Sequence, residues 1–213
     1  MIRILKLLFA ISGLALVAST SVKAEIDEGI EYKLVSPPVR TADKDKVEVV
    51  EMFWYGCPHC YKFEPKLNKW KKTMPANVVF KRIPAIFPNR NIWEIHARAY
   101  YTAELLGVID KIHQPLFEAI HKHKQKIYTE EALADFFSQH GIDKKTFKDT
   151  FNSFGVQMKI NIAKDLSRRY QIDGVPTMIV NGRYRTHASL TGSQDGILKV
   201  VDFLIQKESQ ARK

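Results

Sequence analysis

The sequence predicts an α/β protein in which a block of helices interrupts a single sheet. Strand-like apolar runs lie within residues 32–54 and at residues 78–83, and they return only at residues 177–186, whereas residues 91–169 show helical spacing throughout. A strand–helix–strand unit therefore precedes the helical block, and a β-hairpin follows it. This order is typical of an α/β domain that carries a helical insertion.

The first part of the chain predicts three strands and a helix. Residues 32–35 form a short apolar run, and residues 47–54 form a longer one whose nearly continuous hydrophobicity indicates a strand buried on both faces. A helix is expected to begin at Pro58, since proline at the first helical position costs no hydrogen bond. Residues 78–83 then predict the third strand.

The helical block and the closing elements carry their own start and stop signals. Gly107 predicts the end of one helix. Thr129 and Asp143 are suited to cap two more, because their side-chain oxygens accept hydrogen bonds from the first helical turn. Asn181-Gly182 is a strong hairpin signal between two short strands. A last helix is expected from Ser193.

The N-terminus, residues 1–24, has the pattern of a cleaved secretory signal. Arg3 and Lys6 precede an apolar run over residues 7–18, and small residues lead to a cut after Ala24. The run of about 12 residues is shorter than the roughly 20 that span a bilayer, although an uncleaved anchor is the alternative. Export predicts an oxidising compartment such as the periplasm.

The charge of the chain is strongly positive, with a formal net charge of +10. Such a surplus can favour nucleic acid or an anionic membrane surface. The lysines are scattered, however, and no basic run alternates with aromatic residues that could stack on bases. We therefore expect a solvated positive surface and no nucleic-acid partner.

The two cysteines of the chain lie three positions apart, in the motif Cys57-Pro58-His59-Cys60. Cys57 is the expected N-cap of a helix, where unpaired N–H groups and the helix dipole stabilise a thiolate. His59 can donate a hydrogen bond or carry a positive charge beside that sulfur. We expect Cys57 to be the exposed, attacked sulfur and Cys60 to be buried and to resolve the mixed disulfide. A lowered pKa of Cys57 makes the disulfide a stronger oxidant.

Three other uses of the cysteine pair are less consistent with the sequence. A disulfide that only staples a turn would close a loop too short to remove much chain entropy. Zinc needs about four ligands, and the nearest histidine cluster, His121 and His123, does not share one helix face. Haem attachment needs a histidine where Tyr61 stands. We expect no metal, and no cofactor beyond the Cys57–Cys60 disulfide.

Glu51 is an acid within the buried strand over residues 47–54, six positions before Cys57. A buried carboxylate is costly unless it is paired or protonated. One interpretation is an ion pair with Lys81 on the third strand. The other is an acid–base relay that takes and returns protons as the dithiol cycles, and the two interpretations can hold together.

The segment Gly174-Val175-Pro176 precedes the strand expected at residues 177–180. A proline that opens a strand after a tight turn is a candidate for a cis peptide bond. Because few bonds before proline are cis, these residues alone favour the trans form.

These motifs together resemble those of one protein family. Residues 53–61 (FWYGCPHCY) and residues 63–65 (FEP) resemble the DsbA family of periplasmic thiol–disulfide oxidoreductases. Residues 174–176 (GVP) and Asn181-Gly182 resemble its cis-proline loop and hairpin, and residues 152–154 (NSF) resemble a stretch near the end of its helical insertion. The resemblance covers nearly all of the mature chain.

The resemblance implies a thioredoxin fold with an inserted helical domain. Residues 25–84 and 157–213 would form the thioredoxin-like domain, and residues 85–156 the insertion. It also implies a cis bond before Pro176, packed against the active-site sulfur. The backbone of Val175 would then bind an extended substrate chain.

The implied reaction is donation of the Cys57–Cys60 disulfide to unfolded, newly exported proteins, followed by reoxidation by a membrane quinone-linked partner of the DsbB type. Glu51 matches the family's buried acid. The alternatives are an isomerase or reductase that is kept reduced, and a holdase-type binding module with incidental thiols. Many isomerases carry a separate N-terminal dimerisation domain, and residues 25–56 are too few for one, which favours a monomeric oxidase.

Overall fold

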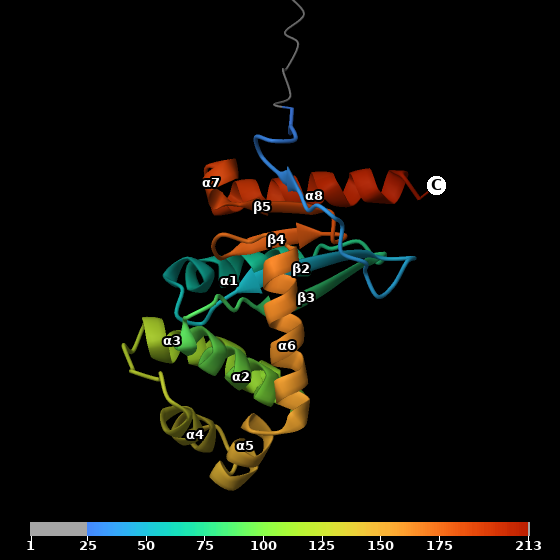
Figure 1. The fold of residues 1–213 in the computed structure, drawn as a ribbon. Helices are drawn as coiled ribbons and strands as arrows, with labels where there is room; N and C mark the ends of the chain where they lie inside the picture. Colours follow the sequence, from blue (N-terminus) through green and yellow to red (C-terminus); the bar gives the residue numbers. More distant parts are fainter. Residues whose placement is uncertain (1–24, 213) are drawn as a thin grey trace, which may run out of the picture.

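The computed structural model describes residues 25–212, which build a mixed five-stranded sheet with helices around it (Figure 1). The expected signal at residues 1–24 lies outside the described residues. The strand order is β1-β5-β4-β2-β3, in which β2 and β3 are parallel and the other neighbours are antiparallel. The strands are β1 (Lys33–Leu34), β2 (Val47–Phe53), β3 (Val78–Pro84), β4 (Thr177–Val180) and β5 (Tyr184–His187).

Five helices come between β3 and β4, as the helical pattern of the middle of the chain predicts. Figure 1 shows α2 to α5 gathered on one side of the sheet, α6 running from them back to the sheet, and α8 along the other side. The helices are α1 (Pro58–Lys71), α2 (Asn91–Leu105), α3 (Ile109–His121), α4 (Glu130–Gln139), α5 (Lys144–Phe151), α6 (Phe154–Arg169), α7 (Ala188–Thr191) and α8 (Gln194–Gln210).

The capping residues are confirmed as helix starts. Thr129 Oγ1 accepts a hydrogen bond from Ala132 N at 3.2 Å, and Asp143 Oδ2 accepts one from Thr146 N at 2.9 Å. Gly107 follows α2 with a φ of 68°, which suits a residue without a side chain. The local chemistry of these polar and glycine residues therefore sets the helix boundaries.

The hairpin between β4 and β5 turns at Asn181 and Gly182, which both have positive φ, 52° and 63°. A Cβ atom at Gly182 would lie 2.0 Å from the carbonyl oxygen of Val39. Glycine is therefore required here both by the turn and by the close approach of a neighbouring backbone.

Two details differ from the expectations. The first strand is only Lys33–Leu34, because Pro37 and Pro38 follow closely and cannot donate to a sheet ladder. The short helix α7 was not expected, since a single turn is too brief to show a periodic pattern.

The central strand β2 is buried along its whole length. Val47 and Val49 pack in the core that α1 and α8 share, whereas Val50 and Met52 pack in a different cluster. Since side chains alternate between the faces of a strand, Glu51 lies on the same face as Val49 and points towards α1. The strand thereby places an acid beneath the helix that carries both cysteines.

Candidate active site

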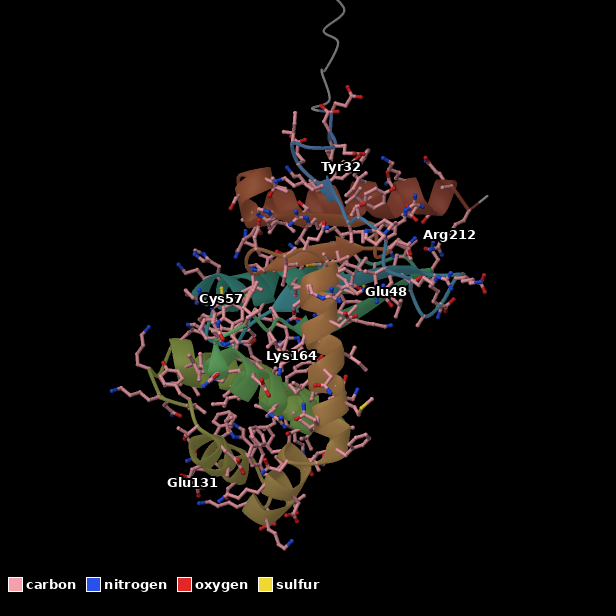
Figure 2. The ribbon with its side chains drawn as sticks, viewed as in Figure 1. Tyr32, Glu48, Cys57, Glu131, Lys164 and Arg212 are labelled. Carbon is pink, nitrogen blue, oxygen red and sulfur yellow. The ribbon has the colours of Figure 1, made fainter. Side chains whose placement is uncertain are left out.

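The two cysteines occupy the start of α1. Cys57 is the N-cap residue with an extended backbone, and Pro58 takes the first helical position. Both sulfurs are free thiols. Figure 2 shows Cys57 and Glu48 at opposite ends of the sheet, with Cys57 near the helices that follow β3.

Cys57 is more accessible than Cys60, as expected, but it is much less exposed than expected. Cys57 is 7% exposed, whereas Cys60 is fully buried at 0%. The prediction of an exposed Cys57 is therefore wrong in extent, because neighbouring side chains cover most of the residue. The exposed part of Cys57 borders a pocket of about 480 Å³, which is also lined by Trp54, Pro58, Phe87, Pro88, Arg90, Trp93, Asp173, Gly174 and Val175.

The surroundings lower the pKa of Cys57 and raise that of Cys60. The pKa of Cys57 falls from 9.0 to about 6, chiefly through a hydrogen bond with the Cys60 thiol; burial opposes this shift, and the backbone N–H groups of Cys60 and His59 support it. The charge of His59 lowers the Cys57 pKa further, as a smaller contribution. Burial raises the pKa of Cys60 well above 9.0, and Cys57 and the Glu51 charge add to that rise. At neutral pH the pair therefore holds one thiolate, on Cys57.

His59 lies on the exposed side of the first turn of α1. Its backbone oxygen accepts a hydrogen bond from Gln194 Nε2 at 2.8 Å, which joins α1 to the start of α8. Its ring acts on Cys57 by charge, behind the effects of Cys60 and the backbone. Most of the thiolate stabilisation therefore comes from the helix start itself.

The segment before β4 lies against the reactive sulfur. Cys57 Sγ lies 3.4 Å from the carbonyl oxygen of Val175, to which the protonated thiol donates. The Val175–Pro176 bond is cis, as the resemblance implied and contrary to what these residues alone favoured. A second pocket of about 640 Å³ is lined by His59, Lys62, Asp173, Gly174, Val175, Pro176, His187, Ala188, Ser189, Ser193 and Gln194. Surface hollows thus adjoin this segment on the Cys57 side and on the His59 side.

Glu51 is fully buried and pairs with Arg82, not with Lys81. Arg82 Nε donates to Glu51 Oε2 at 2.9 Å, while Lys81 Nζ donates to Glu48 Oε2 at 2.6 Å. The predicted Glu51–Lys81 pair is wrong because Glu51 and Arg82 are in register on the parallel strands β2 and β3 and share a face. Lys81, one position away, points to the opposite face.

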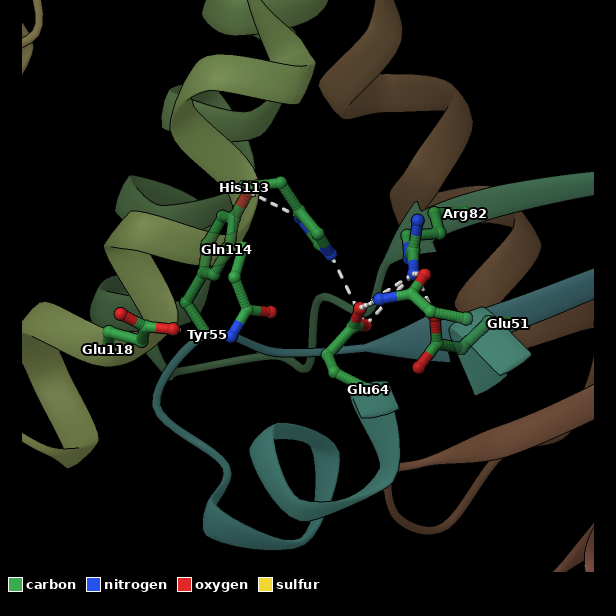
Figure 3. A network of polar contacts seen from close by, with 8 residues as sticks. Glu51, Tyr55, Glu64, Arg82, His113, Gln114 and Glu118 are labelled. Carbon is green, nitrogen blue, oxygen red and sulfur yellow. Dashed lines mark hydrogen bonds and ion pairs between the residues drawn. The ribbon is translucent and has the colours of Figure 1, made fainter. Parts of the chain in front are cut away.

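Glu51 belongs to a larger buried polar network, which comprises Tyr55, Glu64, Arg82 and His113 as well (Figure 3). Burial and the neighbouring Glu64 raise the pKa of Glu51 to about 8, against the opposing effect of Arg82. Since the Glu51 charge in turn raises the pKa of Cys60, the acid and the buried thiol interact electrostatically.

Sequence reasoning missed three members of this network as functional candidates: Tyr55, Arg82 and His113. Glu64 and Tyr55 appeared only within motifs of the resemblance, FEP at residues 63–65 and FWYGCPHCY at residues 53–61. Contacts between residues 18 to 58 positions apart hold the network together. No local pattern signals such contacts, and only the register of β2 and β3 could have suggested Arg82.

Within residues 25–212, no three His, Cys, Asp or Glu side chains gather in a way that could hold a metal ion. His121 instead makes a hydrogen bond of 2.7 Å to the Tyr55 carbonyl oxygen and stacks on Tyr61. Across the same residues, no helix combines the length and apolar character needed to cross a membrane.

Comparisons with known proteins agree with this architecture. The family model described as DSBA-like thioredoxin domain matches residues 82–196. The thiol:disulfide interchange protein DsbA of Pseudomonas aeruginosa is 44% identical over 203 residues, which cover 94% of this chain and 95% of that protein. The protein of the same name from Azotobacter vinelandii is 44% identical over 189 residues, covering 89% and 87%.

Solved structures agree as well. A crystal structure of Pseudomonas aeruginosa DsbA superposes with a TM-score of 0.83 at 45% identity, covering 88% of this chain and 97% of that one. The oxidoreductase NmDsbA1 of Neisseria meningitidis superposes with a TM-score of 0.77 at 25% identity, covering 89% and 97%. The chain belongs to the DsbA family of thiol:disulfide oxidoreductases and has its thioredoxin fold with inserted helices.

Proposed function

We propose that this protein donates its Cys57–Cys60 disulfide to newly exported, unfolded proteins in the periplasm. The observation that carries the proposal is the split in acidity at the start of α1, where the pKa of Cys57 is about 6 and that of Cys60 lies well above 9.0. A thiol with a low pKa is a good leaving group, so the reduced form is favoured and the disulfide is oxidising.

The exchange proceeds in two steps. A substrate thiolate attacks Cys57, which forms a mixed disulfide and expels Cys60. A second substrate thiolate then attacks the substrate's own sulfur, forms the substrate disulfide and releases Cys57 as a stabilised thiolate. Two electrons pass from the substrate to the protein, and reoxidation by a DsbB-type membrane partner passes them on to a quinone. No cofactor beyond the disulfide takes part.

Glu51 supplies the proton that the first step requires. Because burial holds the pKa of Cys60 high, Cys60 leaves readily only if it is protonated as it departs. A buried acid whose pKa is about 8 is suited to give that proton and to take it back. The electrostatic interaction of Glu51 with Cys60 supports this assignment.

The remaining site residues have supporting roles. Pro58 begins α1 without leaving a hydrogen bond unmade, and His59 adds positive charge near the Cys57 thiolate. The backbone of Val175, next to Pro176, binds an extended substrate chain beside the sulfur it already contacts.

The organisation of the whole chain follows from the same proposal. Residues 1–24 are a cleaved signal for export, residues 25–84 and 157–213 form the thioredoxin-like domain, and residues 85–156 form the inserted helical domain. The mature protein acts as a monomer.

A refolding assay tests the function. Mature protein in the disulfide form is expected to convert a reduced, unfolded protein to its native, disulfide-bonded state, and Cys57→Ala is expected to abolish this conversion. Lys145→Ala, on the exposed surface of α5, serves as the matched control and should retain full activity. A reduction potential near that of thioredoxin, about −270 mV, would contradict the oxidase. If Cys57→Ser left the assisted folding unchanged, a holdase would be the better description.

A further inference from the structure

The buried polar network contains two carboxylates and one guanidinium. Glu51 and Glu64 are both 0% exposed. Arg82 reaches both of them, with Nε 2.9 Å from Glu51 Oε2 and Nη2 2.8 Å from Glu64 Oε2. Since an uncompensated buried charge is costly, these three side chains stay neutral as a group only if one carboxyl keeps a proton.

The hydrogen bonds show which carboxyl that is. Glu64 receives Arg82 Nη2 on both oxygens, at 3.1 and 2.8 Å, and Asn68 Nδ2 at 3.3 Å. Among the described residues, Glu51 receives Arg82 Nε alone, and its other oxygen, Oε1, has no hydrogen-bond partner. Donors favour the ionised form of the group they reach. The arrangement therefore keeps the negative charge on Glu64 and the proton on Glu51.

His113 of α3 adds the decisive donor to Glu64. Its Nε2 lies 3.3 Å from Glu64 Oε1, and its Nδ1 lies 2.9 Å from the Tyr55 hydroxyl (Figure 3). An ionised carboxylate only accepts, so Nε2 must carry a hydrogen. Burial raises the pKa of Tyr55 well above 10.0, so the hydroxyl keeps its proton and donates it to Nδ1. Burial also lowers the pKa of His113, which leaves the ring neutral in this single tautomer.

We propose that His113 is a positioning residue that keeps the shared proton on Glu51, because its Nε2–H holds Glu64 in the ionised form. The inference rests on the proposed function only in that Glu51 is taken there as the proton donor to Cys60. Other titratable or charged groups lie around the network or on the pocket beside it: Lys71 and Cys60 of α1, Lys81 of β3, Tyr100 and Glu104 of α2, Asp110 of α3 and Lys159 of α6. They are unchanged in the variants that follow.

A carboxyl titration tests this role without any substrate. The reduced mature protein is labelled with ¹³C at the glutamate carboxyl carbons, and Glu51 and Glu64 are followed by NMR over pH. In His113→Leu, the midpoint of Glu64 is expected to rise and that of Glu51 to fall, each by about one pH unit or more. His113→Gln, whose amide can donate from the position of Nε2, is expected to restore both midpoints.

A second variant keeps the test decisive if His113→Leu does not fold. The shorter amide of His113→Asn reaches towards Tyr55 but not Glu64, so it is expected to shift the midpoints as leucine does. His140→Gln is the matched control, because the one hydrogen bond that the His140 ring makes within residues 25–212 is to the Phe136 carbonyl oxygen of α4. It should leave both midpoints in place.

The outcomes separate this inference from the proposed function. Unshifted midpoints in folded His113→Leu or His113→Asn, or failure of His113→Gln to restore them, would overturn the role of His113 whatever the oxidase rates are. Shifted midpoints with unchanged rates of substrate oxidation would uphold that role, while counting against Glu51 as the proton donor.

Discussion

The thiol pair at the start of α1 and the carboxylate pair beneath it each contain two acids with very different pKa values, but the causes of the difference are not the same. In each pair, one group has a lowered pKa and its close neighbour a raised one. Cys57 has a pKa of about 6 and Cys60 one well above 9.0. Glu64 has a pKa below 4.5, because donors from His113 and Arg82 outweigh a burial that would raise it, and Glu51 has a pKa of about 8.

The difference between the two pairs lies in what separates them. The pKa of Cys57 is lowered by groups within three residues of it, chiefly the partner thiol and then two backbone N–H groups of the first turn, whereas the pKa of Cys60 is raised chiefly by burial. The carboxylates are split by side chains from distant segments, with Arg82 18 positions from Glu64 and His113 49 positions from it. The helix start acts locally, whereas the carboxylate network acquires the His113 donor only once the inserted helix α3 packs next to α1.

The largest difference is expected between variants that each lack one of the two thiols. Cys60→Ala leaves the attacked sulfur without its resolving partner, so mixed disulfides with substrate proteins are expected to accumulate on Cys57. Cys57→Ala should form none, because the remaining thiol is buried and has a high pKa. Non-reducing electrophoresis of the two variants makes the comparison. Equal amounts of trapped complex would contradict the assignment of roles.

Loss of Arg82 should strongly destabilise the folded protein. Arg82→Leu leaves the ionised Glu64 fully buried without its cation, and a stability loss of about 3–5 kcal/mol is expected. Urea unfolding of the oxidised form measures it. Adding Glu64→Gln to Arg82→Leu removes the uncompensated charge and should recover part of the loss. A double variant no more stable than Arg82→Leu would show that charge is not the cause.

The thiolate should stabilise the reduced protein in a defined pH window. The pKa of Cys57 is lower in the folded state, about 6, than its ordinary value of 9.0. The folded state therefore holds fewer protons, and the stabilisation is complete above pH 9, declines as the pH falls and is lost below about pH 6. Unfolding of reduced protein against reduced Cys57→Ser isolates this effect. A stability difference that stayed constant from pH 6 to pH 9 would refute it.

The smallest expected effect is at His59, whose charge ranks behind the backbone and Cys60 in stabilising the thiolate. His59→Leu should raise the pKa of Cys57 by less than about one unit and make the disulfide slightly less oxidising. Thiolate absorbance over pH measures the shift. If titration were unchanged, His59 would have no electrostatic role; a shift of several units would mean that the helix start contributes little.

Features that depend on neighbouring residues could be predicted from the sequence, whereas contacts between distant segments could not. The motif Cys57-Pro58-His59-Cys60 could be interpreted because the groups that lower the pKa of Cys57 lie within it. The order of strands and helices follows from apolar periodicity and capping residues. The partner of Glu51 could not be chosen correctly, because Lys81 and Arg82 are neighbours whose faces depend on strand register. His113 gave no signal and Tyr55 appeared only within the FWYGCPHCY motif, since the contact between them depends on how α3 packs in the fold.

The most direct test of the central claim is the redox state of Cys57–Cys60 in the cell. Rapid acid quenching and alkylation of free thiols separates the dithiol from the disulfide by size, with Cys57→Ala as a marker that cannot form the disulfide. A protein that donates disulfides and is reoxidised in the periplasm should be found mainly as the disulfide. A pool that is mainly dithiol would contradict the account and indicate an isomerase or reductase.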